Sequence, residues 1–150
     1  MTAIELAKCT DMKNIYLIGK DSLPIYYSKK NIVEFIINNK TIVLKATIDN
    51  IIAGYVIGNQ KDDTNFHINT FAVDQLYRRR GIGKDLIVNL IKRATRDSFN
   101  EITNITLFVQ TTNDAAISLY KSLKFEIDKE IKDYYWDGEH SYLMKFIVAK

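Results

Sequence analysis

Apolar positions recur with two different periods along this chain, and each change of period separates a predicted strand from a predicted helix. Apolar residues spaced three or four apart predict amphipathic helices, whereas alternating or β-branched runs predict strands. The predicted helices cover residues 12–18, 28–39, 82–94 and 113–123, and Gly19 is predicted to end the first of them. The predicted strands cover residues 3–7, 41–48, 51–58, 66–73, 102–109, 125–132 and 142–148.

The order of these elements predicts the fold class. Three consecutive strands are joined by the short polar turns Asp49-Asn50 and Asp62-Asp63, which predicts an antiparallel meander. Residues 66–109 then form a strand–helix–strand unit, and a crossover helix of this kind joins parallel strands. The first strand is predicted at an edge. The chain is therefore predicted to be an α+β protein with a mixed, mostly antiparallel sheet of about seven strands and about four helices.

Length and composition limit the class of protein. With 150 residues, 47% hydrophobic and 26% charged, the chain is predicted to be one globular domain spanning residues 1–150. The net charge of +3 is small for a nucleic-acid-binding protein, and residues 78–80 are its only tight basic cluster. Cys9 is the only cysteine, which excludes an internal disulfide and a structural zinc site built from paired thiols. No apolar run approaches the roughly 20 residues that span a bilayer. The prediction is a cytoplasmic protein without metal, membrane or direct nucleic-acid contact.

A basic turn with two glycines, Arg-Arg-Arg-Gly-Ile-Gly at residues 78–83, joins a predicted strand to a predicted helix. Gly81 and Gly83 let a ligand approach the main chain closely, and the helix directs its unpaired N–H groups to the same place. This arrangement suits an anion, most often a pyrophosphate. It is not a Walker A motif, because Lys84 is followed by Asp85, nor a dinucleotide-binding motif, because residue 86 is leucine. For the turn taken alone, a glycine loop with solvated arginines is the alternative.

The spacing R-x-x-G-x-G at residues 78–83 resembles the acetyl-CoA-binding signature of the GNAT acetyltransferases. Residues 113–125 resemble the N-x-x-A-x-x-L-Y-x-x-x-G-F motif of the same superfamily, with Lys124 where glycine is usual. Together the motifs imply a GNAT fold, in which the strands before and after the glycine turn and its helix splay apart around the cofactor. Lys124 is then expected to adopt a left-handed conformation at some energetic cost.

The resemblance also implies a set of acetyl-CoA contacts. Asn113 matches the residue that bonds the pantetheine arm, and Tyr120 matches the tyrosine that gives a proton to the departing thiolate. A backbone N–H near Val73 is expected to meet the thioester oxygen. The alternative for Tyr120 is a packing role in the core. The residues predicted to bind the cofactor are Phe71, Ala72, Val73, Arg78, Arg79, Arg80, Gly81, Ile82, Gly83, Lys84, Asn113 and Tyr120.

Three further stretches, residues 23–27, 76–79 and 133–140, narrow the resemblance to the N-alpha-acetyltransferases, and most closely to NatE-type and RimI-like enzymes. In that family, two of these segments form walls over the substrate's first residues. The resemblance implies acetyl transfer to the α-amine of protein N-termini, and a ribosome-associated auxiliary subunit is a further partner that such enzymes can have. The apolar residues 23–25 offer no carboxylate, which favours starts of Met followed by an apolar residue. The predicted substrate contacts are Leu23, Pro24, Ile25, Tyr27, Asn69, Tyr134 and Tyr135.

The predicted general base is His67. NatE-type enzymes use a tyrosine on the strand before the glycine turn and a histidine on the strand after its helix, and the matching residues here are His67 and Phe108. His67 has an ordinary pKa of about 6.5, suited to proton transfer, and is expected to share a strand face with Asn69 and Phe71. A purely structural histidine is the alternative, and His140, on a loop, is a weaker candidate base.

Acetyl transfer to an α-amine asks less of a base than transfer to a lysine. The α-amino pKa of roughly 8 leaves an appreciable neutral fraction near pH 7, whereas a lysine near 10.4 costs roughly 4 kcal/mol to deprotonate.

Two other functions stay open: acetylation of a small amine, polyamine or lysine side chain, and a non-catalytic CoA-binding subunit. A small-amine enzyme would offer acidic residues to a cationic substrate. The non-catalytic reading is favoured by Lys124 and Phe108 and disfavoured by the intact glycines.

Overall fold

The computed structural model describes residues 2–96, 101–133 and 139–148 of the chain. Its strands are β1 (Thr2–Leu6), β2 (Thr41–Ile48), β3 (Ile51–Gln60), β4 (Asn65–Val73), β5 (Asn104–Gln110), β6 (Glu126–Ile131) and β7 (Ser141–Ile147). Its α-helices are α1 (Met12–Ser22), α2 (Lys29–Ile37), α3 (Ile82–Arg96) and α4 (Asp114–Ser122). Two short 3₁₀ helices, Cys9–Asp11 and Gln75–Tyr77, precede α1 and the glycine turn.

The strands form one sheet in the order β1-β2-β3-β4-β5-β7-β6. Only the β4–β5 pairing is parallel, and all other neighbours in the sheet run antiparallel. Asp49 and Asn50 adopt φ angles of 52° and 66°, the conformation that a tight hairpin requires. The predicted α+β class, the mixed sheet with its four α-helices, and the edge position of the first strand are confirmed.

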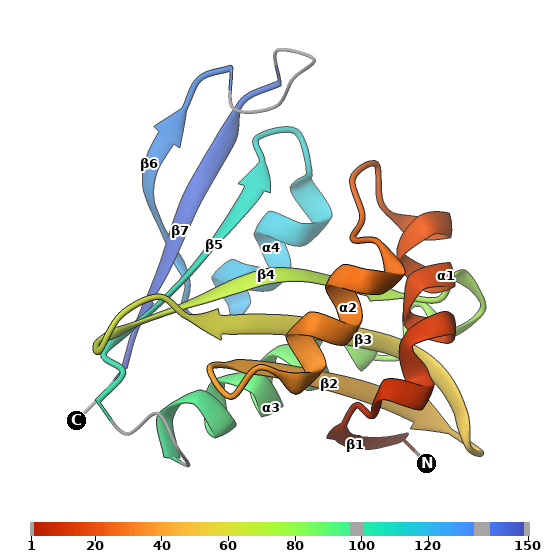
Figure 1. The fold of residues 1–150 in the computed structure, drawn as a ribbon. Coiled ribbons are helices and arrows are strands. Elements are labelled where there is room, and N and C mark those ends of the chain that lie inside the picture. The colour runs from red at the N-terminus through yellow and green to blue at the C-terminus, as the bar shows by residue number, and fades with distance from the viewer. Residues whose placement is uncertain (1, 97–100, 134–138, 149–150) are drawn as a thin grey trace.

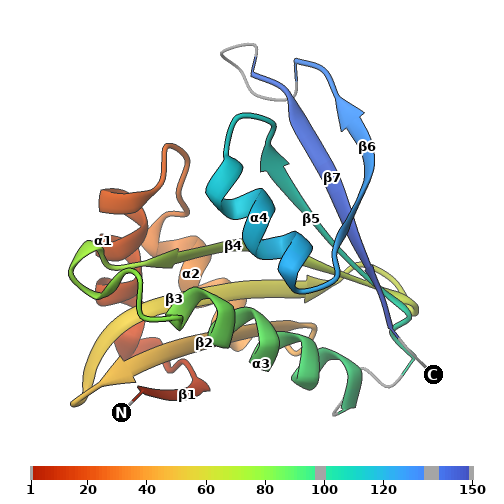
Figure 2. The ribbon, with the colours of Figure 1, turned by 180° about the vertical axis from the view of Figure 1, so that it is seen from behind.

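Helices cover both faces of the sheet. Figure 1 shows α1 and α2 on one face, and Figure 2 shows α3 and α4 on the other. On the α1/α2 face, Ile15, Ile18 and Ile32 pack against apolar side chains of β2 and β3. On the α3/α4 face, one apolar stripe of α3 and the buried side of α4 form a larger core with Phe66 and Phe125. The amphipathic pattern of the two helices that carry the sequence motifs therefore serves to dock them on the same face.

Helix α1 does not end at Gly19, as the sequence suggested, but continues to Ser22. A Cβ atom at Gly19 would lie 2.6 Å from the Oη atom of Tyr55, so glycine here permits close packing of the helix on β3. Burial raises the pKa of Tyr55 to about 12, although its hydrogen bond to Thr70 acts in the opposite direction. The helix instead ends where Leu23 becomes extended, with φ −121° and ψ 143°, ahead of Pro24.

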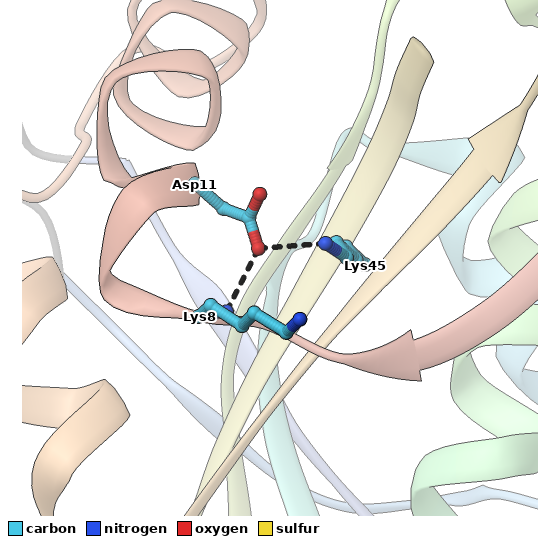
Figure 3. Close-up of polar contacts among 3 residues, drawn as sticks. All are labelled: Lys8, Asp11 and Lys45. Carbon is cyan, nitrogen blue, oxygen red and sulfur yellow. Dashed lines mark hydrogen bonds and ion pairs between the residues drawn. The ribbon is translucent and has the colours of Figure 1, made fainter. Parts of the chain in front are cut away.

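An ion pair fastens the start of α1 to the sheet (Figure 3). The Nζ atom of Lys45 on β2 lies 2.8 Å from Oδ2 of Asp11, which also accepts a 2.8 Å hydrogen bond from the backbone N–H of Lys8. Partial burial by itself raises the pKa of Asp11, but the hydrogen bonds and charges of Lys45 and Lys8 outweigh it and hold the pKa below its ordinary value. The contact fixes the helix from which residues 23–27 project.

Strands β4 and β5 separate part-way along their length. Their ladder runs from Asn65 opposite Asn104 to Ile68 opposite Leu107, and both strands then continue without pairing to each other. Figure 1 shows β5 diverging from β4 towards α4. The splay that the family resemblance implied is thus present. The sequence had placed the start of β5 two residues too early, at residue 102, because Ile102 is apolar and buried although it precedes the strand.

A β-bulge in β4 lies next to this separation. Ile57 pairs with Thr70 and Gly58 with Ile68, so Asn69 is an extra residue on β4. An extra residue reverses the alternation of side chains beyond it. His67 therefore faces α1 and α2, whereas Phe71 packs with the core on the α3/α4 face. The prediction that His67, Asn69 and Phe71 share one strand face is wrong for this reason.

Candidate active site

A cavity of about 970 Å³ opens where β4 and β5 separate. Its lining comes from the segment between α1 and α2, from the second half of β4, from the glycine turn, from β5 and from α4. Of the residues singled out from the sequence, the lining includes Leu23, Pro24, Ile25, Tyr27, His67, Asn69, Phe71, Ala72, Val73, Arg78, Arg79, Asn113 and Tyr120. The structure thus brings seven of the predicted cofactor residues and five of the predicted substrate residues to one continuous space.

The glycine turn contributes Arg78 and Arg79 to the cavity lining, and its two glycines follow closely in the chain. Gly81 has a φ of +80° and no atom within 4 Å of the place where its Cβ would lie. The first helical bond of α3 runs from the Asp85 N–H to the Gly81 carbonyl at 3.0 Å, so the N–H groups before Asp85 have no partner within the helix. These groups, with the positive end of the helix dipole, suit a phosphate.

The cavity lining does not include five of the predicted cofactor residues, Arg80, Gly81, Ile82, Gly83 and Lys84. The Ile82 side chain is 1% exposed and belongs to the core, so only its backbone remains available to a ligand. Arg80 stacks its guanidinium 5.3 Å from the Tyr77 ring centroid and does not line the cavity. Gly83 sits on the first turn of α3, where a Cβ would come within 3.2 Å of the Phe71 ring.

The free edge of β4 offers backbone groups to the same cavity. The Asp74 N–H donates to the Ala53 carbonyl on β3 at 2.8 Å. Successive residues of a strand direct their N–H and C=O groups to alternate sides, so those of Val73 point away from β3 into the gap. The Val73 carbonyl there accepts a 3.1 Å hydrogen bond from Nε of Arg78. The Val73 N–H therefore faces the place where the resemblance puts the thioester oxygen.

Helix α4 supplies the second motif. Asn113 caps the helix by accepting a 3.2 Å hydrogen bond from the Ala116 N–H, and it also lines the cavity. Tyr120 is 6% exposed, packs edge-on to Phe71 at 6.0 Å between ring centroids, and reaches the cavity from the core. Both a packing role and contact with a ligand are therefore compatible with its position.

Lys124 ends α4 in the conformation that the sequence predicted, with a φ of +77°. The Lys124 N–H bonds the Lys121 carbonyl and the Phe125 N–H bonds the Tyr120 carbonyl, each at 3.0 Å. This is a Schellman motif, in which glycine is the usual residue at the left-handed position. The motif holds Phe125 against Tyr120, with 5.9 Å between the ring centroids, so it helps to fix Tyr120.

His67 lies at the base of the gap with partners that the sequence did not reveal. Its Nδ1 atom is 2.8 Å from Oγ1 of Thr106 on β5, and its ring centroid is 5.1 Å from that of Phe108. Burial, aided by the positive charge of Lys61, lowers the pKa of His67 to about 4. His67 is therefore neutral near pH 7. Alternation along β5, which places Thr106 and Phe108 opposite the buried Leu107, was the signal that could have identified Thr106.

The segment between α1 and α2 forms an apolar wall of the cavity. Ile25 is 55% exposed, and Tyr27 packs edge-on to Phe35 of α2 with 4.9 Å between ring centroids. Ser28 directly precedes α2, close to the start that the sequence predicted, and its Oγ accepts a 3.1 Å hydrogen bond from the Asn31 N–H. The predicted second wall, with Tyr134 and Tyr135, lies outside the described residues.

Comparison with known proteins identifies the family. The model of the acetyltransferase (GNAT) family matches residues 4–125. An N-alpha-acetyltransferase of Sulfolobus acidocaldarius is 34% identical over 152 aligned positions, which cover 94% of this chain and 89% of that protein. This chain belongs to the GNAT acetyltransferase family. The assignment made from the two sequence motifs is confirmed.

Solved structures agree with this assignment. The ribosomal-protein-S18-alanine N-acetyltransferase of Escherichia coli superposes with a TM-score of 0.89 at 25% identity, covering 100% of this chain and 96% of the other. Ard1 of Thermoplasma volcanium gives a TM-score of 0.89 at 27% identity, covering 99% of each chain. The GNAT fold therefore extends beyond the segment that the family model matches.

Acetyl-CoA is the acetyl donor of GNAT acetyltransferases, and the residues present fit it. The open space at Gly81, the start of α3 and the two arginines in the cavity lining suit its phosphates. The gap between β4 and β5, with free backbone groups on β4, suits an extended amide-containing arm. When bound, acetyl-CoA supplies an activated acetyl thioester.

Outside residues 1, 97–100, 134–138 and 149–150, no helix has the length and apolar character needed to cross a membrane. In the same part of the chain, no three side chains of the His, Cys, Asp and Glu types come together in a way that could hold a metal ion.

Proposed function

We propose that this GNAT acetyltransferase transfers acetyl from acetyl-CoA to the α-amine of protein N-termini. The observation that carries the proposal is one cavity that is lined by Arg78 and Arg79 of the glycine turn, by α4 and by residues 23–27. A donor held at the glycine turn and an amine entering along the wall of residues 23–27 would meet at the gap between β4 and β5. The name of the Sulfolobus acidocaldarius relative supports the same reaction.

The chemistry of the cavity favours an α-amine over a more basic amine. An α-amino group has a pKa of roughly 8, so a useful fraction is neutral near pH 7. His67, with a pKa of about 4, is too weak a base to deprotonate an ammonium group efficiently. In the proposed reaction the amine therefore binds in its neutral form. If His67 accepts the proton lost during acyl transfer, its Nδ1–H must donate to Thr106 so that Nε2 is free.

The other catalytic roles in the proposed reaction are assigned to the residues that the sequence analysis predicted for them. The Val73 N–H would polarise the thioester carbonyl, and the Arg78 bond to the Val73 carbonyl would hold that strand edge in place. The Tyr120 hydroxyl would donate a proton to the sulfur as the acetyl group leaves. Both groups belong to elements that are fixed by packing, which is what preorganised catalysis needs.

The charges in the cavity argue against a cationic small molecule as the substrate. Its described lining contains Lys61, Arg78 and Arg79 but no aspartate or glutamate. A polyamine would meet no carboxylate there and would be repelled by the lysine. A peptide N-terminus, which carries one amine followed by neutral backbone, suits the lining better.

The wall of residues 23–25 favours an apolar first residue. Leu23, Pro24 and Ile25 have no polar side chain, and burying a Met or Leu side chain against them gains roughly 1.5–3 kcal/mol. We therefore propose that starts of Met followed by an apolar residue are the preferred substrates. Peptides that begin with Ser, Ala, Asp or Glu would be poorer, and internal lysines poorest.

A peptide screen tests the proposal. The purified protein is incubated with acetyl-CoA and peptides that differ only in their first two residues, and the acetylated nitrogen is assigned by tandem mass spectrometry. The expected result is α-amine acetylation, with kcat/KM for Met-apolar starts roughly tenfold or more above that for Ser starts. A peptide with a blocked α-amine and a free lysine, together with spermidine, serves as the control. Faster acetylation of either control would overturn the proposed function.

The predicted setting of the enzyme belongs to the same proposal. A cytoplasmic location and a ribosome-associated auxiliary subunit would bring the enzyme to newly made N-termini. Cell fractionation tests the location. Co-purification of the chain with ribosomes, before and after a salt wash, tests the association.

A further inference from the structure

One polar side chain in the cavity has an acceptor with no partner. The Oδ1 atom of Asn69 is buried and receives no hydrogen bond from any residue that the structure describes. Asn69 lines the cavity and is the bulged residue that directly follows the last β4–β5 pair. A buried acceptor without a donor destabilises the folded protein. At a ligand site, a hydrogen bond from the ligand to such an atom therefore contributes more binding free energy than a bond to an acceptor that already has a partner.

We infer that Oδ1 of Asn69 accepts a hydrogen bond from the backbone N–H of the substrate's second residue, so that the site selects peptides over free amines. The inference rests on the proposed function, because it concerns how an N-terminal peptide lies in the cavity. It adds a specificity-determining residue and a required chemical group, an amide N–H next to the reacting amine.

The position of Asn69 favours the amide as the donor. Asn69 lies where the gap begins, and the reacting amine must enter that gap to reach the thioester. One residue of extended chain spans about 3.3–3.6 Å, so the second residue's amide stays close to the amine. A side-chain acceptor bonded to the amine itself would favour the protonated ammonium, which is the unreactive form. Bonding the neighbouring amide orients the peptide without that penalty.

Asn59 provides a matched comparison within the same sheet. Its Oδ1 atom is also buried and also lacks a partner among the described residues. Asn59 lies opposite His67 on β3, but it does not line the cavity. Replacing either asparagine by leucine removes an unpaired buried acceptor and keeps the number and branching of the side-chain heavy atoms, and only Asn69 is expected to affect the substrate.

The first arm of the test changes the substrate and needs no variant. Two Met-start peptides are compared, one with alanine and one with N-methylalanine as the second residue. The methyl group removes the N–H and keeps the side chain. The ratio of kcat/KM for the two peptides measures the contribution of the N–H, together with any steric effect of the methyl group.

The second arm measures the same ratio in Asn69→Leu and Asn59→Leu. The steric effect of the methyl group is common to all three proteins, so the difference between ratios isolates the hydrogen bond. The ratio is expected to fall roughly three- to tenfold in Asn69→Leu and to stay at the wild-type value in Asn59→Leu. Asn69→Leu should melt about 2–4 °C above the wild type because it loses an unsatisfied acceptor. Asn59→Leu should gain less, because it also loses the 3.4 Å hydrogen bond from Nδ2 to the Gln60 carbonyl.

Each outcome decides the matter. A lower ratio in Asn69→Leu alone supports the inference. An equal ratio in the wild type and Asn69→Leu overturns the inference. It is also overturned if Asn69→Leu keeps the ratio but no longer discriminates between Thr-start and Val-start peptides, because Asn69 would then contact the side chain of the substrate's first residue. If Asn69→Leu fails to fold, equal rates for the two Met-start peptides on the wild type are sufficient to overturn it. Failure of the proposed function is separate, because the wild type would then acetylate no peptide α-amine.

Discussion

Acidification should destabilise this protein through His67, because the folded state holds that side chain neutral. The pKa of His67 is lowered to about 4 by burial and by the charge of Lys61, whereas the unfolded chain protonates near 6.5. Between pH 6.5 and pH 4 the unfolded state therefore binds more protons than the folded state. Stability consequently falls as the pH falls through that window and is independent of His67 above it.

The size of the effect follows from the two pKa values. At pH 5 the difference in proton binding corresponds to about 2 kcal/mol relative to pH 8. His67 is partly exposed, and solvent screening reduces the expected loss to about 1–2 kcal/mol. For a chain of 150 residues, that loss lowers the melting temperature by roughly 3–6 °C. The variant His67→Gln, which cannot titrate, should lack this part of the pH dependence.

The assay is urea unfolding of the wild type and His67→Gln at pH 8 and pH 5, with the free energies extrapolated to water. An NMR titration of the imidazole Hε1 signals measures the His67 pKa directly, and the signal missing from the variant identifies it. An apparent pKa near 6.5 for that signal, or the same loss of stability at pH 5 in both proteins, would refute the reasoning.

Two further perturbations test the cofactor end of the site, and a third tests the turn after α4. Gly83→Val places a β-branched side chain against the Phe71 ring, where even a Cβ would lie 3.2 Å away. It should raise the acetyl-CoA dissociation constant, measured by calorimetry, at least roughly tenfold. The control Lys92→Val, on the exposed part of α3, should leave that constant unchanged. Tyr120→Phe should lower turnover on the order of 10²-fold with unchanged acetyl-CoA affinity, and wild-type turnover would make Tyr120 a packing residue. Lys124→Gly should stabilise the fold by about 1 kcal/mol in denaturant titration, because glycine relieves the φ of +77°, and an unchanged midpoint would contradict this.

The sequence predicted those parts of the fold that depend on neighbouring residues. The hairpin at Asp49-Asn50 and the start of α2 near Ser28 follow from local backbone chemistry, and the left-handed Lys124 follows from the glycine that the family motif has at that position. The glycine turn could be identified from the sequence because its motif consists of neighbouring residues with a characteristic spacing. The periodic spacing of apolar residues then predicted which face of each helix and strand is buried.

The errors arose where contacts distant in sequence override a local signal. Gly19 looks like a helix end, but its position against Tyr55 makes it a packing residue inside α1. The bulge at Asn69 depends on how β4 pairs with β3, and nothing in residues 66–73 alone marks an extra residue. The low pKa of His67 similarly depends on burial by other elements. These are the features that decide what His67 and Asn69 can do in the site.

The bulge and the separation of β4 from β5 act together to divide the site between the two faces of the sheet. Without the bulge, His67 and Phe71 would lie on the same face, and the imidazole would compete with the aromatic packing around Tyr120. With it, Phe71 lies against Tyr120 on the face of α3 and α4, where the glycine turn begins. His67 lies on the face of α1 and α2, where residues 23–27 form a wall. In the proposed reaction the acyl donor and the amine would both reach the gap, and they would approach it from opposite faces of the sheet. That geometry explains why changes at residues 23–25 should alter substrate preference while leaving acetyl-CoA affinity unchanged.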